Sequence, residues 1–503
     1  MTILIDPVRT HAAATPKRLA VGCAETGRRW TWAELDARID RSAAWLVARL
    51  GATSGARVAV LARNHPLQLV LQIACARAGA IFVPLNWRLA LPEIEVLLAD
   101  ADPALLFRDP DFAPPDVPVE THLLADLETL GEPGGTPPPD ARCGWDEAMT
   151  LLYTSGTSGK PKGVIVTEGN AFWGNANFIF GSLVGHNSVF LCDMPMFHTA
   201  GLFAAVRVPI LAGGKVWISA GFDPAKTIAR IADPALGITH YFSVPQMATT
   251  LWQHPDFTPG KFRGLSLYVT GGAPNPRAQV ERFARAGIRF SDGFGMSETG
   301  SNFAMPVLDE ARLIAKAGSC GLPLLAVQPR IVDENGADVT RGEVGELWLR
   351  GPSVTPGYWN QPELTAAAFD DGWFRTGDAA MQDAEGFYFL VDRKKDMYIS
   401  GGENVYPAEV EAVLAELPEV SEAAIVGVPD ERWGEVGRAY VIPIEGRSIS
   451  AETVIAHCTA RLARFKVPKS VAITATIPRT ASGKVQKHLL RARALEEIEA
   501  DAN

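Results

Sequence analysis

One stretch of the chain decides how the rest is interpreted. Residues 153–163 read Tyr153-Thr154-Ser155-Gly156-Thr157-Ser158-Gly159-Lys160-Pro161-Lys162-Gly163. Glycines let a backbone turn tightly and bring its N–H groups close to a ligand. The serine and threonine hydroxyls and the two lysines add hydrogen-bond donors and positive charge. This combination predicts a loop that binds a polyphosphate.

The loop does not follow the Walker pattern, which is G-x-x-x-x-G-K-[ST]. Counted from Gly156, the second glycine is replaced by Pro161, and Lys160 is not followed by Ser or Thr. The segments on either side, 149–153 and 164–167, are both typical of strands. A loop between two strands cannot place a phosphate on a following helix N-terminus. A surface hairpin is the alternative interpretation, and the particular order of residues favours phosphate binding.

Composition limits the possible functions. A chain of 503 residues is expected to form two or more domains. The net charge of −10 argues against nucleic acid or an anionic membrane as a partner. No apolar run approaches the roughly 20 residues that span a bilayer, and the N-terminus does not have the pattern of a signal peptide. Six widely spaced cysteines favour reduced thiols in a cytoplasmic protein over disulfides or a zinc site.

Strand and helix patterns alternate through the first part of the chain. A capping-box residue, Thr31, begins a predicted helix that ends at Leu50. Strands are predicted at 57–61 and 80–85 with a helix at 67–78 between them, which favours a parallel sheet. Residues 108–142 are rich in Pro, Gly and Asp and are predicted to be an irregular surface segment. From about residue 340 the strands are shorter (345–350 and 387–391), and strand and helix alternate again near 423–428. Pattern alone places a domain boundary within 335–400.

Several further motifs follow the loop. They are Gly271-Gly272-Ala273-Pro274, Gly293-Phe294-Gly295-Met296-Ser297-Glu298-Thr299, Trp373-Phe374-Arg375-Thr376-Gly377-Asp378, Asp392-Arg393-Lys394-Lys395-Asp396, Ser400-Gly401-Gly402-Glu403-Asn404-Val405-Tyr406-Pro407, and Pro478-Arg479-Thr480-Ala481-Ser482-Gly483-Lys484. In this order, and with the loop at 153–163, they resemble the motifs of the adenylate-forming enzymes, which include acyl-CoA synthetases, adenylation domains of peptide synthetases, and luciferases. The resemblance covers essentially the whole chain.

The resemblance implies a multidomain α/β fold. The large N-terminal domain, residues 1–392, would hold βα-layered sheets and a β-barrel-like part. A hinge at 393–396 would join it to a small, mobile α+β domain at 397–503. The implied activity is AMP-forming acyl-CoA synthesis, in which a carboxylate attacks ATP to give an acyl-adenylate and pyrophosphate, and the thiol of coenzyme A then displaces AMP. ATP, Mg²⁺ and coenzyme A are the implied substrates and cofactor, and a homodimer is left open.

The resemblance also assigns roles to individual residues. Lys484 would bridge the attacking carboxylate and the α-phosphate, Glu298 would bind Mg²⁺, and His198 would lie beside the acyl tunnel. Lys395 would be the hinge residue that lets the small domain rotate between the two half-reactions. The residues expected to bind ATP or AMP are Thr154, Ser155, Gly156, Thr157, Ser158, Gly159, Lys162, Gly272, Ala273, Pro274, Asp292, Gly293, Phe294, Gly295, Met296, Ser297, Asp378 and Arg393. Those expected to line the coenzyme A tunnel are Gly401, Gly402 and Glu403.

Two positions differ from the family's usual motif. Phe294 stands where tyrosine is common, which keeps a ring to stack on adenine, and Ser297 stands where threonine is usual, which keeps the hydroxyl. The Gly293-x-Gly295 pattern does not extend to a dinucleotide-binding fingerprint, because that fingerprint needs a third glycine at Glu298.

The acid itself is not identified by these motifs. The expected acyl pocket consists of Phe197, His198, Phe203, Val244, Gly271, Gly300 and Phe303. Its apolar character disfavours a dicarboxylic acid and leaves medium- or long-chain fatty acids and aryl acids such as hydroxycinnamates open. Two other functions are weighed: an adenylation enzyme that loads a carrier protein, although no carrier domain follows Asn503, and an ATP-binding protein without turnover.

Overall fold

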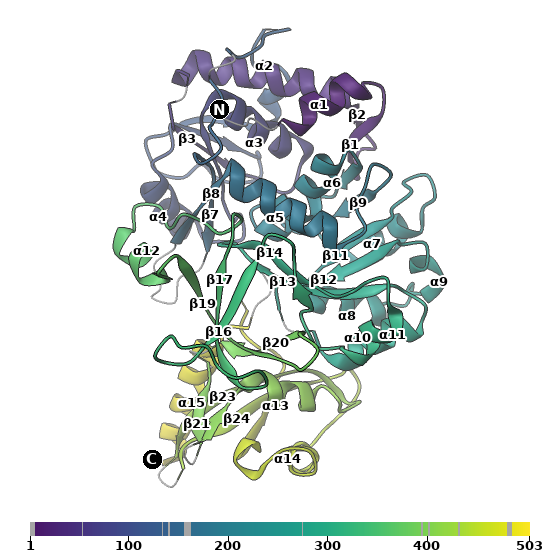
Figure 1. The fold of residues 1–503 in the computed structure, drawn as a ribbon, viewed down its shortest axis with the longest axis vertical. Coiled ribbons are helices and arrows are strands. Elements are labelled where there is room, and N and C mark those ends of the chain that lie inside the picture. The colour runs from purple at the N-terminus through teal and green to yellow at the C-terminus, as the bar shows by residue number, and fades with distance from the viewer. Residues whose placement is uncertain are drawn as a thin grey trace.

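The computed structural model describes residues 6–52, 54–132, 134–138, 141–154, 162–273, 275–393, 396–400, 403–430, 433–479 and 485–502. Figure 1 shows a large part that holds most of the chain and a smaller part that holds the C-terminal residues. The fold is mixed α/β, as the sequence predicts.

Two sheets form most of the large part. The first has the strand order β15-β14-β13-β12-β11-β9-β10-β1-β2, and the second has the order β6-β5-β3-β4-β7-β8. The strands of the first are β1 (Leu19–Cys23), β2 (Arg29–Thr31), β9 (Val189–Cys192), β10 (Lys215–Ile218), β11 (His240–Ser243), β12 (Leu267–Thr270), β13 (Phe290–Met296), β14 (Gly300–Ala304) and β15 (Leu322–Pro323). Those of the second are β3 (Arg57–Leu61), β4 (Ile81–Pro84), β5 (Leu105–Arg108), β6 (Glu120–Leu123), β7 (Ala148–Thr154) and β8 (Lys162–Thr167).

Two smaller sheets follow along the chain. The third sheet contains β16 (Gln328–Val332), β17 (Val344–Arg350), β18 (Phe369–Asp370), β19 (Trp373–Gln382) and β20 (Tyr388–Arg393). The fourth contains β21 (Tyr398–Ser400), β22 (Glu403–Val405), β23 (Val420–Asp430), β24 (Gly434–Pro443) and β25 (Ser470–Ile473). The change from the third sheet to the fourth falls between Arg393 and Tyr398.

Helices cover and separate the sheets. They are α1 (Pro7–Ala14), α2 (Trp32–Leu50), α3 (Pro66–Ala78), α4 (Leu91–Ala101), α5 (Glu168–Gly181), α6 (Val208–Ala212), α7 (Pro224–Ala232), α8 (Pro245–Gln253), α9 (Pro259–Phe262), α10 (Arg277–Arg285), α11 (Glu310–Ala315), α12 (Pro362–Ala368), α13 (Pro407–Leu414), α14 (Ala451–Thr459) and α15 (Lys487–Ala502). The π-helix η2 (Ala200–Arg207) and the short 3₁₀ helices η1 (Leu124–Glu128) and η3 (Arg464–Lys466) complete the set. In the described part of the chain, no helix is long and apolar enough to cross a membrane.

The predicted helix after Thr31 is confirmed as α2. The Thr31 side chain accepts a hydrogen bond from the Glu34 backbone N–H, and Glu34 Oε2 accepts one from the Thr31 N–H at 2.8 Å. This reciprocal capping satisfies two backbone donors that the helix itself leaves unpaired.

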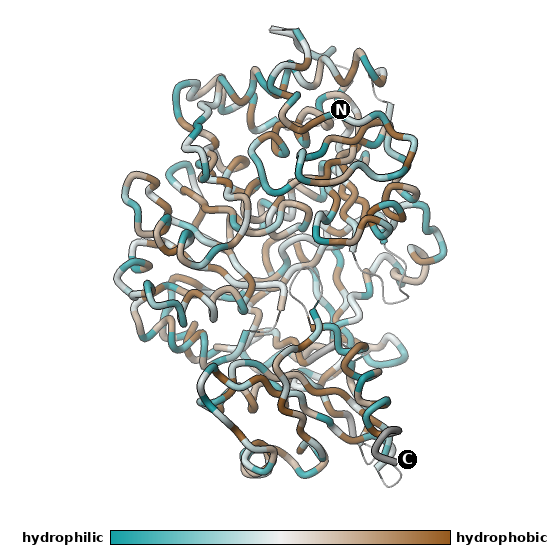
Figure 2. The backbone as a smooth tube through the Cα atoms, turned by 180° about the vertical axis from the view of Figure 1, so that it is seen from behind, coloured by the Kyte–Doolittle hydropathy of each residue, from teal (hydrophilic) through white to brown (hydrophobic). Residues whose placement is uncertain are grey.

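One core extends across both large sheets. It contains side chains of α2, α3 and α5 together with residues of β3, β9 and β10. Every residue of α3 is buried, which is the pattern of a helix enclosed between layers. In Figure 2 the apolar stretches gather inside the large part, and polar stretches follow its outer turns.

The prediction of a fully irregular segment at 108–142 is wrong. Strand β6 lies within it and pairs in parallel with β5, and η1 follows directly. The side chains of β6 alternate between half-buried and exposed. A four-residue strand of this kind at a sheet edge carries too few buried apolar residues to stand out from a loop.

Candidate functional site

A cavity of about 1230 Å³ opens between the large part and the C-terminal part. The carboxyl ends of β11, β12 and β13 reach it, as expected for ligand binding in a parallel sheet. Residues of the C-terminal part, among them Val426, Gly427 and Arg491, also line the cavity.

The β13–β14 hairpin positions Glu298. The two strands pair antiparallel up to Met296 and Gly300, and Gly300 has a left-handed φ of 64°. A Cβ at Gly300 would lie 3.0 Å from the Cα of Gly174 on α5, so both the turn and the helix contact require glycine. Glu298 therefore projects into the cavity from a tightly constrained turn.

Two groups from the 355–358 loop hold Glu298. The Thr355 N–H donates to the backbone oxygen of Glu298 at 2.6 Å, and the Tyr358 hydroxyl donates to Oε1 at 3.2 Å. Burial and the nearby carboxylate keep the pKa of Tyr358 well above its usual value, so this hydroxyl stays a donor. Glu298 is only 9% exposed, and these two hydrogen bonds orient it.

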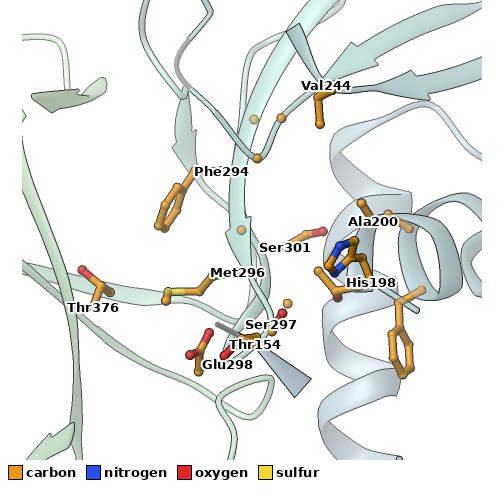
Figure 3. Close-up of a pocket in the computed structure, with 18 of the residues that line it drawn as sticks. Thr154, His198, Ala200, Val244, Phe294, Met296, Ser297, Glu298, Ser301 and Thr376 are labelled. Atoms are coloured by element: carbon orange, nitrogen blue, oxygen red, sulfur yellow. The ribbon is translucent and has the colours of Figure 1, made fainter. Parts of the chain in front are cut away.

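The start and the end of the 153–163 loop lie at the cavity. Strands β7 and β8 pair antiparallel with Thr154 opposite Lys162, and both residues line the cavity. In Figure 3, Thr154 lies beside Ser297 and Glu298. The remaining predicted loop residues, Ser155, Gly156, Thr157, Ser158 and Gly159, lie outside the described residues.

The predicted adenine side of the site is partly assembled. Gly272, Gly293, Phe294, Gly295 and Met296 line the cavity, and Figure 3 shows Phe294 and Met296 on the side that faces Thr376. Ala273 is not among the cavity-lining residues of the described chain, and Pro274 lies outside the described residues.

Asp292 is buried beside this group. Its Oδ1 accepts a hydrogen bond from the Thr270 hydroxyl at 3.1 Å, and Asn275 Nδ2 donates to the same hydroxyl at 2.8 Å. Burial raises the pKa of Asp292 to about 8, although the Thr270 hydrogen bond acts in the opposite direction. Asp292 therefore lines the cavity mainly as a neutral carboxylic acid at pH 7.

Asp378 and Arg393 lie opposite each other where β19 pairs with β20. Asp378 is buried and does not itself line the cavity, whereas its neighbours Arg375, Thr376 and Gly377 do. The side chains of Arg393 and Glu403 lie outside what the structure describes, as do residues Lys395, Gly401, Gly402 and Lys484. On the two sides of Lys484, Arg479 and Val485 both line the cavity.

The predicted acyl pocket is largely brought together. His198, Phe203, Val244, Gly271, Gly300 and Phe303 line the cavity. Phe197 does not, because its ring packs against the rings of Trp87 and His198, with centroid distances of 6.3 and 4.5 Å. Figure 3 shows His198, Ala200 and Ser301 on the opposite side of the β13–β14 hairpin from Phe294.

A π-helix forms one wall of this pocket. η2 contributes Ala200, Phe203 and Ala204 to the lining. A Cβ at Gly201 would lie 2.2 Å from the Pro195 oxygen, so glycine lets η2 start against the preceding loop. π-helical turns are rare and are frequent at functional sites.

The sequence analysis missed several cavity residues. Tyr358 and Asn175 lie outside every motif, and so does Asp193, a fully buried carboxylate whose pKa burial raises to about 6. Tyr358 follows Glu298 by sixty positions, so no local spacing connects the two. For Asn175 a signal existed, because it is a polar residue on the apolar face of a helix.

The donor set at Glu298 suits a magnesium ion bound largely through phosphate. Within the described ranges, no cluster of three or more His, Cys, Asp or Glu side chains could hold a metal ion. Mg²⁺ in nucleotide sites commonly takes one or two carboxylates and fills its other positions with phosphate oxygens and water. Glu298 beside Thr154 fits that role.

Comparison with known proteins agrees with this geometry. Residues 8–359 match the family described as AMP-binding enzyme, and residues 409–484 match the AMP-binding enzyme C-terminal domain. The chain is 40% identical over 494 residues to a feruloyl-CoA synthase of an Amycolatopsis species, covering 97% of this chain and 98% of that protein. It is 37% identical over 504 residues to the indoleacetate–CoA ligase of Aromatoleum aromaticum, covering 97% of each.

The o-succinylbenzoate CoA synthetase of Bacillus subtilis has been solved in two informative states. With its acyl-adenylate intermediate it superposes with a TM-score of 0.88 at 30% identity, covering 98% of this chain and 99% of that one. A double mutant bound to a product analogue, OSB-NCoA, superposes with a TM-score of 0.72 at 30% identity, covering 97% and 99%.

Proposed function

The chain belongs to the AMP-binding enzyme family, and from this premise we propose that it is an AMP-forming CoA ligase for an aryl monocarboxylic acid. The enzyme uses ATP, Mg²⁺ and coenzyme A to convert a carboxylic acid into its CoA thioester. The observation that carries the proposal is a single cavity with two kinds of wall. Thr154, Lys162 and Glu298 line one part of it, and Phe178, Phe203 and Phe242 line another.

The first half-reaction joins the acid to the α-phosphorus of ATP. A carboxylate oxygen forms a bond to phosphorus while the bond to pyrophosphate breaks. Such a reaction depends mainly on positioning and charge neutralisation. We assign Thr154 and Lys162 to the departing phosphates and Lys484 to the bridge between the two reacting anions. Glu298 would hold Mg²⁺, which neutralises phosphate charge when bound.

The second half-reaction needs a different arrangement of the same site. The thiol of coenzyme A attacks the acyl carbon and AMP leaves, so Lys484 has to make room. We propose that residues 397–503 rotate about Lys395 and bring Gly401, Gly402 and Glu403 to the cavity. The better superposition on the adenylate-bound relative than on the relative with the product analogue supports two arrangements of these parts.

Three aromatic rings support an aryl acid. Phe178, Phe203 and Phe242 line the acyl end, and Phe178 and Phe242 meet edge to face with centroids 5.9 Å apart. Aromatic side chains provide large, flat contact surfaces for an arene. The two curated relatives named above, a feruloyl-CoA synthase and an indoleacetate–CoA ligase, are consistent with this substrate class.

A panel of acids tests the proposal. AMP release is measured with ATP, Mg²⁺ and coenzyme A for hydroxycinnamates, arylacetates, medium- and long-chain fatty acids and a dicarboxylic acid. We expect aryl monocarboxylic acids to have the highest kcat/KM. A preference for fatty acids would overturn the substrate class, and no AMP release with any acid would favour a non-catalytic ATP-binding protein. Replacing coenzyme A by a carrier protein separates the ligase from an enzyme that loads carriers.

We also propose a cytoplasmic location. All six cysteines are free thiols buried in the fold. A reducing compartment keeps thiols in this state. Fractionation of cells that express the protein tests the proposal.

A further inference from the structure

Helix α5 runs along the acyl end of the cavity. Asn170, Ala171, Gly174, Asn175 and Phe178 line the cavity, and their spacing of three and four residues places them on one face of the helix. Ser182, which follows the helix, lines it as well. Successive residues of this face therefore contact successive depths of the acyl pocket.

Asn175 differs from the other asparagines of α5. Its side chain is buried, with 3% exposure, and among the described residues the structure shows no hydrogen bond to its amide. By contrast, Asn170 Nδ2 donates to the Pro352 and Val354 oxygens at 2.9 and 2.8 Å. Asn177 donates to the Ser301 oxygen at 3.0 Å and accepts from the Ala326 N–H at 3.3 Å.

The amide of Asn175 is available to a ligand. It lines the cavity and makes no hydrogen bond to a described residue, whereas amides inside a fold are nearly always hydrogen-bonded to the protein or to water. Asn175 faces the cavity, where a substrate can supply the missing partner. The amide offers an acceptor oxygen and two N–H donors, which matches a group that both donates and accepts.

The surroundings determine which group fits. The rings of Phe178 and Phe203 and the small side chains of Ala200 and Ala204 line the same end of the cavity. No described cavity-lining residue of α5, η2, β11 or β12 is a lysine or arginine. The carboxylate of Asp193, which also lines the cavity, further disfavours an anionic substituent. The substrate group that fits these surroundings is an uncharged hydroxyl on an aromatic ring.

We propose that Asn175 determines specificity by hydrogen-bonding a phenolic hydroxyl on the ring of the acid. The phenol O–H donates to Oδ1 of Asn175, and Nδ2 donates to the phenol oxygen or to the oxygen of a neighbouring methoxy group. This inference rests on the proposed function, since it names the ring substituent that the ligase selects. Sites that hydrogen-bond a substrate hydroxyl discriminate strongly against analogues that lack it.

The test compares 4-hydroxycinnamate with cinnamate. In the wild-type enzyme we expect kcat/KM for 4-hydroxycinnamate to exceed that for cinnamate by about 10- to 100-fold, the range for one buried hydrogen bond. In Asn175→Leu, which has a similar volume and no hydrogen-bonding group, this ratio should fall to near one. Asn175→Ser supplies a hydroxyl that can still form a hydrogen bond, so this variant should keep part of the preference for 4-hydroxycinnamate.

Asn177→Leu is the matched control. Asn177 lies on the same helix and is equally buried, but it does not line the cavity and its amide is hydrogen-bonded to the protein. We expect this variant to lower the melting temperature and to leave the substrate ratio as in the wild type. If Asn175→Leu does not fold, Asn175→Ala gives the same comparison without added volume.

The outcomes separate the two proposals. If aryl acids are activated and the ratio is the same in the wild type, Asn175→Leu and Asn177→Leu, Asn175 does not recognise the hydroxyl, and the inference is wrong while the proposed function stands. If the wild-type enzyme releases AMP with fatty acids and not with aryl acids, the proposed substrate class fails, and the inference fails with it.

Discussion

The two ends of the cavity are built in different ways. The proposed nucleotide end is formed by hairpins and turns in which neighbouring residues lie together, such as β7–β8 and β13–β14. The proposed acyl end is formed by one face of α5, by η2 and by the ends of β11 and β12, which are separate elements that each contribute a few side chains. We infer that ATP, which the ligase uses with any acid, is bound by runs of consecutive residues. The acid, which differs between the relatives named above, is recognised by single residues from separate elements.

The chemistry of each ligand explains this difference. ATP is the same molecule whichever acid reacts, and backbone groups in turns can bind its phosphates at fixed positions. The acid varies, so its pocket changes by single substitutions on a constant scaffold. Mutations at the nucleotide end should therefore affect every acid equally, and mutations at the acyl end should change the order of preference among acids.

The largest effect is expected at the nucleotide end. In Lys484→Ala, the rate of adenylate formation should fall by about 10²–10³-fold, the usual loss when one stabilising donor is removed from a transition state. The loss should be similar for every acid. Pyrophosphate exchange measures adenylate formation, and synthetic acyl-adenylate with coenzyme A measures thioester formation alone. An equal loss in both half-reactions would contradict the role assigned to Lys484.

The structure brings both predicted ends of the site to the cavity: six of the seven residues predicted for the acyl pocket line it, and so do Thr154, Lys162, Gly272 and residues 292–298. The motif at 293–298 could be recognised because Glu298 and its neighbours are consecutive. Asn175 belongs to no motif, and only the fold brings it to the cavity. The π-helix η2 was also missed, since no local pattern separates it from an α-helix. Phe197 does not line the cavity, although it precedes His198. Tertiary packing decides these three features.

The next largest effect concerns the pH dependence of the free energy of unfolding, which we expect Asp292 to change. Because burial raises the pKa of Asp292 to about 8, the folded protein keeps a proton that the unfolded chain releases near pH 4. The free energy of unfolding therefore decreases as the pH rises from about 4 to about 8. Between pH 6 and 7.5, Asp292 should lower the free energy of unfolding by about 2 kcal/mol.

Asp292→Asn removes this loss, because the amide stays neutral at every pH in the window. Urea unfolding at pH 6 and 7.5 in both proteins measures the difference. Asp193, whose pKa lies at about 6, contributes mainly below this range and is unchanged in the variant. An identical decrease in the wild type and in the variant would show that Asp292 is charged in the fold.

A smaller effect is expected from filling the acyl end. Ala204→Leu adds volume to the wall formed by η2, so kcat/KM for hydroxycinnamates should fall about 20-fold, within the range for added methylene groups in a pocket. The KM for ATP should stay as in the wild type. Propionate, which is much smaller and carries no ring, serves as the control acid. An equal loss for propionate and hydroxycinnamates would contradict the separation of the two ends.

The smallest effect is expected for the Mg²⁺ dependence of adenylation, which reports how firmly Glu298 is oriented. In Tyr358→Phe, Glu298 loses the hydroxyl that donates to Oε1 and keeps its other surroundings. We expect roughly a 10-fold increase in the Mg²⁺ concentration that gives half-maximal adenylation, since groups that orient a ligand of a metal typically contribute this much. The order of preference among acids should not change.

Tyr153→Phe is the matched control for this variant. Tyr153 lies on β7 and its hydroxyl donates to Asp100 Oδ2 at 2.6 Å, away from the cavity lining. Loss of that hydrogen bond should lower stability by about 1 kcal/mol without changing the Mg²⁺ dependence. If both tyrosine variants shift the Mg²⁺ dependence equally, the effect comes from the β7–β8 hairpin as a whole. A shift in Tyr358→Phe alone shows that one side chain outside every motif tunes the end of the cavity that the motifs build.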